Sequence, residues 1–119
     1  MTPEKRVQNS IIKYLKALKD SNKPIFYERR QAGGFSYKKG IPDLYCVYYG
    51  YHIEIEVKAE DGELSVMQEK FRDMCAKNKI FWICANSLED FKIKFERIES
   101  IYIAYMEKIK TLWWHFIYK

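Results

Sequence analysis

The first thirty residues change from a helical to an extended hydrophobic pattern. Within residues 7–18, apolar side chains recur at spacings of three and four, the period of one helix face. Thr2 is a favourable N-cap and Pro3 suits the first helical position, so we expect the helix to begin there and to end near Asp20. The β-rich residues 25–30 predict a strand.

A glycine-rich segment separates this strand from two further β-rich runs. Residues 31–41 contain three glycines and predict a loop, an element that often contacts substrate. Residues 43–49 and 52–58 predict two antiparallel strands joined at Gly50-Tyr51. Glycine at the first central position suits a type II′ hairpin turn.

A helix, a strand and another helix complete the predicted core. Ser65 and Gln68 have the spacing of a capping box and open a helix to about Lys77, followed by a buried strand at residues 80–85. The expected inward face of that helix consists of Met67, Phe71, Met74 and Cys75. Ser87 can cap a further helix. Its apolar face consists of Leu88, Phe91, Phe95 and Ile98. The elements form one αβββαβα series with a helical tail, which indicates an α/β fold.

The residues after position 98 form an aromatic-rich extension. Apolar side chains within residues 101–116 recur at helical spacing, although residues 113–118 could equally be extended. The extension either completes the core of the monomer or forms a dimer interface, where Trp and Tyr are favoured. We therefore divide the chain into a domain at 1–98 and an extension at 99–119.

Composition restricts the class of protein. A chain of 119 residues with 48% hydrophobic and 17% aromatic residues fits one folded domain and excludes a disordered protein. No stretch approaches the roughly 20 apolar residues of a membrane span, and no signal-peptide pattern opens the chain, so we expect a cytoplasmic protein. Three widely spaced cysteines indicate free thiols.

Positive charge is concentrated near the N-terminus. Residues 1–42 hold ten Lys and Arg against three acids, a net charge of +7 within a total of +5. Such a surface can neutralise nucleic-acid phosphates, although a solvated helix face explains Lys13, Lys16 and Lys19 equally well. The preferred candidates for DNA contacts are Lys5, Arg29, Arg30, Lys38 and Lys39.

The predicted hairpin gathers charged side chains on one face. Because side chains alternate along a strand, Asp43, Glu56 and Lys58 share a face. A turn at Gly50-Tyr51 sets Asp43 opposite Lys58 and Glu56 on the diagonal. Glu54 on the same face is expected either to be solvated or to contact the metal-binding residues without touching the metal itself.

Two adjacent carboxylates favour a divalent cation. At about 4 Å and an effective dielectric constant near 20 they would repel by roughly 4 kcal/mol, which a bound cation would offset. Oxygen ligands without His or Cys suit Mg²⁺ or Mn²⁺, which can bind a phosphate and activate water. Lys58 would position or deprotonate that water or stabilise the transition state. Any one of these residues alone could equally be an exposed ion-pair or turn residue.

Glu4 has two interpretations. An acid in the first turn of a helix interacts favourably with the helix dipole, by about 0.3–1 kcal/mol. Glu4 also shares a helix face with Val7, Gln8 and Ile11, so it points toward the body of the protein and could complete a metal site.

The string Gly40-Ile41-Pro42-Asp43 followed by Glu56-Val57-Lys58 resembles the PD-(D/E)xK nuclease signature. With Glu4 and Gln68, the chain over residues 3–95 resembles the VRR-NUC branch, the virus-type replication-repair nucleases. The resemblance implies metal ligation by Asp43, Glu56, the Val57 carbonyl and Glu4, with Lys58 catalytic. It also implies a glutamine near the active site at Gln68, for which the capping box alone is an equal explanation.

The same resemblance implies a restriction-endonuclease-like α/β core, with a mixed sheet flanked by helices, and a Mg²⁺- or Mn²⁺-dependent DNA endonuclease. Stand-alone bacterial or phage members resemble Holliday-junction resolvases and tend to be homodimers, which implies branched DNA as substrate and a second copy as partner. Alternatives are a DNA-binding protein without catalysis, and restriction-type or exonuclease activity on linear DNA.

Overall fold

The computed structural model describes residues 1–30 and 40–119, apart from the side chains of residues 106–108, 110 and 111. Its elements follow the predicted order. They are α1 (Pro3–Asp20), β1 (Ile25–Arg29), β2 (Leu44–Tyr48), β3 (Tyr51–Val57), α2 (Val66–Lys77), β4 (Phe81–Ala85) and α3 (Leu88–Tyr118). The predicted loop at residues 31–39 lies outside the described residues.

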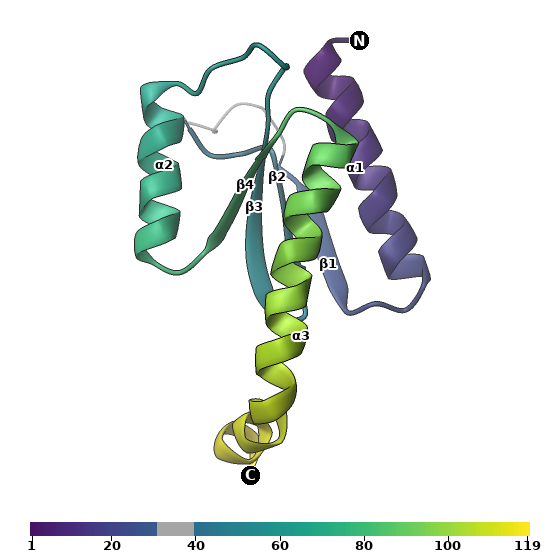
Figure 1. Cartoon of the computed structure of the whole chain (residues 1–119), viewed down its shortest axis with the longest axis vertical. Coiled ribbons are helices and arrows are strands. Elements are labelled where there is room, and N and C mark those ends of the chain that lie inside the picture. The colour runs from purple at the N-terminus through teal and green to yellow at the C-terminus, as the bar shows by residue number, and fades with distance from the viewer. Residues whose placement is uncertain (31–39) are drawn as a thin grey trace.

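The four strands form one mixed sheet in the order β1-β2-β3-β4. The first two pairings are antiparallel, and β3 and β4 are parallel because α2 connects them. Figure 1 shows α2 against one face of the sheet and α1 beside α3 against the other. The predicted mixed sheet flanked by helices is therefore confirmed.

Local sequence signals place the helices and their apolar faces. The Thr2 hydroxyl accepts a hydrogen bond from the Lys5 N–H at 3.1 Å, and Ser87 caps α3 by accepting from the Asp90 N–H at 3.0 Å. Each cap satisfies an N–H that has no partner inside its helix. The core between the sheet and the α1–α3 layer consists of Ile11, Leu15, Leu44, Cys46, Tyr48, Ile53, Ile55, Val57, Ile83, Ala85, Phe91, Phe95 and Ile98.

The hairpin turn differs from the predicted one. Tyr48 pairs with Tyr51, so the central turn residues are Tyr49 and Gly50 and not Gly50-Tyr51. Both have positive φ, 51° and 85°, which is the backbone of a type I′ turn. The strained φ of Tyr49 accompanies ring stacking on Tyr102, with centroids 4.6 Å apart. The turn therefore differs from the one that glycine placement suggested, and it brings Tyr49 into contact with Tyr102.

The change of turn moves the register by two residues. Leu44 pairs with Ile55, and the same register continued by one step brings Asp43 alongside Glu56, not Lys58. A shift of two leaves every side chain on its predicted face, whereas a shift of one would have reversed them all. The predicted grouping of charged side chains therefore survives although the predicted cross-strand pairs were wrong.

The C-terminal extension continues α3 without a break and leaves the body of the protein (Figure 1). Tyr102 packs on Tyr49 and Tyr51 of the hairpin, whereas Trp113 and Trp114 are each 51% exposed and Phe116 is 85% exposed. In α2, Met67 and Met74 were expected to point inward but are exposed. Cys75 is the only residue of this helix that is fully buried. Among the described residues, no helix combines the length and apolarity needed to cross a bilayer.

Gly40, which lies before β2, packs closely against the backbone at the start of α2. Its φ is +91°, and a Cβ at this position would lie 2.4 Å from the backbone oxygen of Met67. Glycine is required here both for its backbone conformation and for this close approach.

We predict that Gly40→Ala destabilises the protein more than Gly50→Ala does. Gly50 has a similar φ of +85° with nothing near the position of a Cβ, so its substitution adds only the left-handed penalty of about 1–2 kcal/mol. Gly40→Ala adds a backbone clash to that penalty. Urea denaturation monitored by circular dichroism measures both. Equal losses of unfolding free energy would contradict the close packing of Gly40 on α2.

Candidate active site

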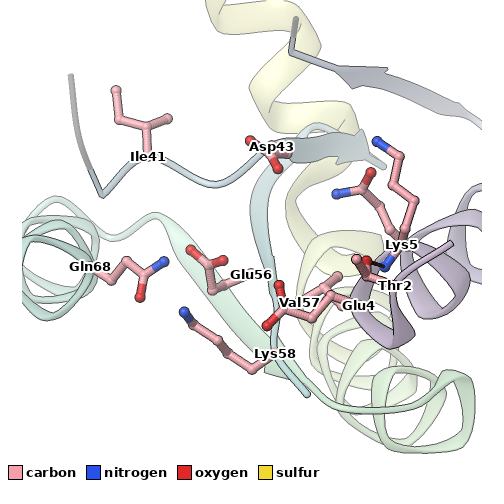
Figure 2. A pocket seen from close by; sticks show the side chains of 10 residues that line it. Thr2, Glu4, Lys5, Ile41, Asp43, Glu56, Val57, Lys58 and Gln68 are labelled. Atoms are coloured by element: carbon pink, nitrogen blue, oxygen red, sulfur yellow. Dashed lines mark hydrogen bonds between the residues drawn. The ribbon is translucent and has the colours of Figure 1, made fainter. Parts of the chain in front are cut away.

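A polar pocket of about 280 Å³ opens where α1, the start of β2, the end of β3 and the start of α2 meet. Figure 2 shows Glu56, Lys58 and Gln68 pointing toward one another, with Asp43 across the pocket and Glu4 and Lys5 entering from α1. The pocket is lined by Thr2, Glu4, Lys5, Gln8, Ile41, Asp43, Glu56, Val57, Lys58 and Gln68. All five predicted catalytic residues therefore contribute to one pocket.

The sheet positions the central residues. Glu56 lies within β3 beside Cys84 of β4, and Lys58 directly follows the strand. The Lys58 N–H donates to the Ala85 carbonyl at 3.0 Å, which extends the parallel ladder by one residue. Asp43 directly precedes β2. The acids on two neighbouring strands thus approach one another from backbones that hydrogen bonds hold in place.

Glu56 is the most perturbed acid of the pocket. Its side chain is only 8% exposed, and its Oε1 atom is buried without a hydrogen-bond partner among the described residues. Burial raises the pKa of Glu56 to about 7; Lys58 opposes this rise, whereas Asp43 and Glu4 add to it. A carboxylate desolvated beside other acids needs a proton or a cation to balance its charge.

The donor set suits a hard divalent cation. Asp43, Glu56 and the Val57 backbone offer oxygen only, and Mg²⁺ is commonly held by one or two carboxylates together with waters and substrate phosphates. Within residues 1–30 and 40–119, no three or more His, Cys, Asp or Glu side chains are close enough to hold a metal by themselves. The arrangement fits an ion that keeps several waters, not a closed protein cage.

Glu4 and Lys5 bring opposite charges from the first turn of α1. The Glu4 Oε1 atom accepts a hydrogen bond from the Ala59 N–H at 3.3 Å, just beyond the end of β3. Glu4 is therefore engaged with the protein while it lines the pocket. Lys5, expected to contact DNA, also lines the pocket.

Gln68 combines the two interpretations of its role. The side-chain Oε1 atom of Gln68 accepts a hydrogen bond from the backbone N–H of Ser65 at 2.8 Å. The backbone N–H of Gln68 donates to the Ser65 hydroxyl at 3.1 Å, which completes the predicted capping box. The same side chain lines the pocket and faces Glu56 and Lys58 in Figure 2. A helix cap can thus fix a side chain at the pocket wall.

One of the two predicted roles of Glu54 required it to be solvated, and this role is wrong. It is 2% exposed and forms two hydrogen bonds of 2.7 Å with the Arg30 guanidinium, while His52 Nε2 lies 2.5 Å from its second oxygen. The sequence alternation placed Glu54 on the polar face correctly. Because α2 covers that face of the sheet, the polar residue is buried and paired.

The predicted DNA contacts have different environments. The Arg29 guanidinium donates to the Asn9 amide oxygen at 2.5 Å on an exposed surface, whereas Arg30 pairs with Glu54. Lys38 and Lys39 lie outside the described residues.

Gln8 is a pocket residue that sequence reasoning did not assign. It is 7% exposed, and its Oε1 atom has no hydrogen-bond partner in the part of the chain described. Its spacing of four from Glu4 was the available signal, because such residues lie on the same helix face.

Comparison with known proteins identifies the fold. No family model matches the chain, and no curated protein matches it either. A solved structure described as "VRR_NUC domain" is similar to it, with a TM-score of 0.66 and 20% sequence identity, over 81% of this chain and 97% of that one. The chain therefore has the nuclease-type α/β fold of a VRR_NUC domain.

Proposed function

We propose that this protein is a metal-dependent nuclease that hydrolyses phosphodiester bonds of DNA. The observation that carries the proposal is the meeting of Asp43, Glu56 and Lys58 in one polar pocket, with a buried Glu56 oxygen that no described group satisfies. The VRR_NUC fold supports the same conclusion, since the signature residues of the resemblance occupy that pocket.

Each of the chain's own groups has a role in this proposal. Asp43, Glu56 and the Val57 carbonyl would hold Mg²⁺ or Mn²⁺, with Glu4 at the edge of the site. The bound ion would supply charge neutralisation and a more acidic water. Lys58 would orient that water or stabilise charge on the phosphate, and Gln68 would fix the position of Lys58 or of a phosphate oxygen. Lys5 would attract the backbone of the substrate.

The cleavage prediction uses matched substitutions. Asp43→Asn and Lys58→Ala should each lower the cleavage rate by about 10²- to 10⁴-fold, the range for loss of a catalytic group. Asp73→Asn, which alters an exposed acid of α2 whose side chain is 70% exposed, should leave the rate unchanged. The assay incubates labelled linear, flap and four-way DNA with Mg²⁺, Mn²⁺ or EDTA. If wild type and variants leave every substrate equally intact, the nuclease proposal is wrong and DNA binding without cleavage is the remaining function.

The same assay tests substrate selectivity. By the resemblance to junction resolvases, we propose a preference for branched DNA. Nicking of the four-way substrate ahead of the linear one would support this, and equal cleavage of both would favour restriction-type or exonuclease activity.

The raised pKa of Glu56 predicts how stability depends on pH. The folded protein holds this proton up to about pH 7, while the unfolded chain loses it near the ordinary value of 4.5. Without metal, the contribution of this group is therefore fully present below pH 4.5 and is lost as the pH rises through 7. The loss is on the order of 3 kcal/mol, since one pKa unit corresponds to about 1.4 kcal/mol.

Glu56→Gln should remove this loss, so that its stability relative to wild type rises between pH 4.5 and 8 in EDTA. Glu69→Gln, a change on the exposed surface of α2, is the control and should follow wild type. Saturating Mg²⁺ at pH 8 should stabilise wild type but not Glu56→Gln. Parallel stability curves for wild type and Glu56→Gln would contradict a buried, perturbed Glu56.

We also propose that the exposed end of α3 joins two copies into a homodimer. Exposed Ile, Leu, Trp and Phe side chains surround this end, and a surface helix that is apolar on several sides favours a partner. Two copies related by a twofold axis would present two pockets to the two strands of a junction.

Sedimentation at micromolar concentration tests the dimer. Wild type should sediment as a dimer, and the double substitution Trp113→Ser with Phe116→Ser should shift it to monomer. Lys16→Ser, which alters an exposed residue of α1, is the control. A monomeric wild type would exclude this role of α3.

A further inference from the structure

Arg30 holds the chain on both sides of Asp43. Its backbone N–H donates to the Asp43 carbonyl at 2.6 Å, and its guanidinium Nη1 donates to the Pro42 carbonyl at 2.7 Å. These two carbonyls belong to the peptide groups before and after the Asp43 Cα. Since the planes of these two peptides set φ and ψ of Asp43, Arg30 fixes the direction in which the Asp43 side chain leaves the backbone.

The guanidinium itself is held by a buried acid of β3. Nη1 and Nη2 donate to the two oxygens of Glu54, each at 2.7 Å, and the guanidinium carbon lies 4.4 Å from the centre of the Tyr45 ring. Glu54 is 2% exposed, so without Arg30 it would be a buried charge. Among the described residues, the imidazole of His52 would be its remaining side-chain hydrogen-bond contact. The Arg30–Glu54 pair is therefore a fixed point within the sheet.

Glu54 and Glu56 lie two residues apart on the same face of β3. One acid holds Arg30, which holds the backbone of Asp43, and the other lines the pocket with Asp43. A single strand thus sets the positions of the Asp43 and Glu56 carboxylates relative to each other.

We propose that the Arg30–Glu54 pair is a positioning element that aligns the Asp43 carboxylate with that of Glu56 for divalent metal binding. The inference builds on the proposed function and gives Arg30 a role other than the phosphate contact expected from sequence. Three of its five N–H groups are used on Glu54 and Pro42. A lysine cannot reproduce this planar, forked set of contacts.

The test compares Arg30→Lys, Glu54→Gln and the double variant with Arg97→Lys, which changes an exposed arginine of α3. Mn²⁺ binding is measured without DNA from the electron paramagnetic resonance signal of the free ion. DNA binding is measured in EDTA, and kcat and KM are measured with Mg²⁺. Thermal melts establish that each variant is folded at the assay temperature.

Both single variants should weaken Mn²⁺ binding and lower kcat by about 10- to 100-fold, the range for residues that orient metal ligands. DNA affinity in EDTA should stay within about twofold. The double variant should be no worse than either single variant, because both act on the same contact. Arg97→Lys should match wild type.

Several results would overturn the positioning role. Weakened DNA binding by Arg30→Lys with unchanged Mn²⁺ affinity would make Arg30 a phosphate contact. Lower melting temperatures with unchanged Mn²⁺ affinity would make the pair a stabilising contact only, and unfolding of both single variants would make it a requirement of the whole fold.

The two proposals can fail separately. If wild type cleaves no DNA but the variants still weaken Mn²⁺ binding, the nuclease proposal fails and the positioning role stands. If wild type cleaves DNA and the variants match it, the positioning role fails alone.

Discussion

Burial of two acids on one face of the central strand constrains the rest of this structure. β3 lies between β2 and β4 and is covered by α2 on one side and by the α1–α3 layer on the other. Glu54 and Glu56 are therefore withdrawn from water, and each requires compensation. Glu54 receives it from Arg30 inside the protein. The Oε1 atom of Glu56 has no hydrogen-bond partner among the described residues, and this difference from Glu54 supports the metal-binding role proposed for Glu56.

Much of the fold could be predicted because its signals are local. The caps at Thr2, Ser65 and Ser87 each depend on a hydroxyl three residues before the N–H that it binds. Strand alternation placed Glu54 and Glu56 on a common face, and a register error of two residues did not alter that face. The pocket residues of the hairpin could therefore be grouped even though their cross-strand partners were misassigned.

The remaining features depend on contacts between distant parts of the chain. The turn at Tyr49-Gly50 is accompanied by stacking of Tyr49 on Tyr102, more than fifty residues later. Burial of Glu54 follows from the cover that α2 provides, and its pairing with Arg30 joins residues 24 positions apart in the sequence. Gln8 lines the pocket because the start of α1 lies beside the end of β3, where Glu4 accepts from the Ala59 N–H. None of these long-range contacts can be predicted from a local sequence pattern.

The unbroken course of α3 has a geometric consequence for anything that binds its free end. Phe91 and Phe95 fix the first turns in the core, and the helix rises about 1.5 Å per residue from there. The residues from Glu99 to Tyr118 continue this helix away from the sheet, and the last turns change direction (Figure 1), so the projecting end is shorter than a straight helix of that length. A molecule attached at the tip would therefore be oriented relative to β3 by the bend in the helix as well as by the contact itself.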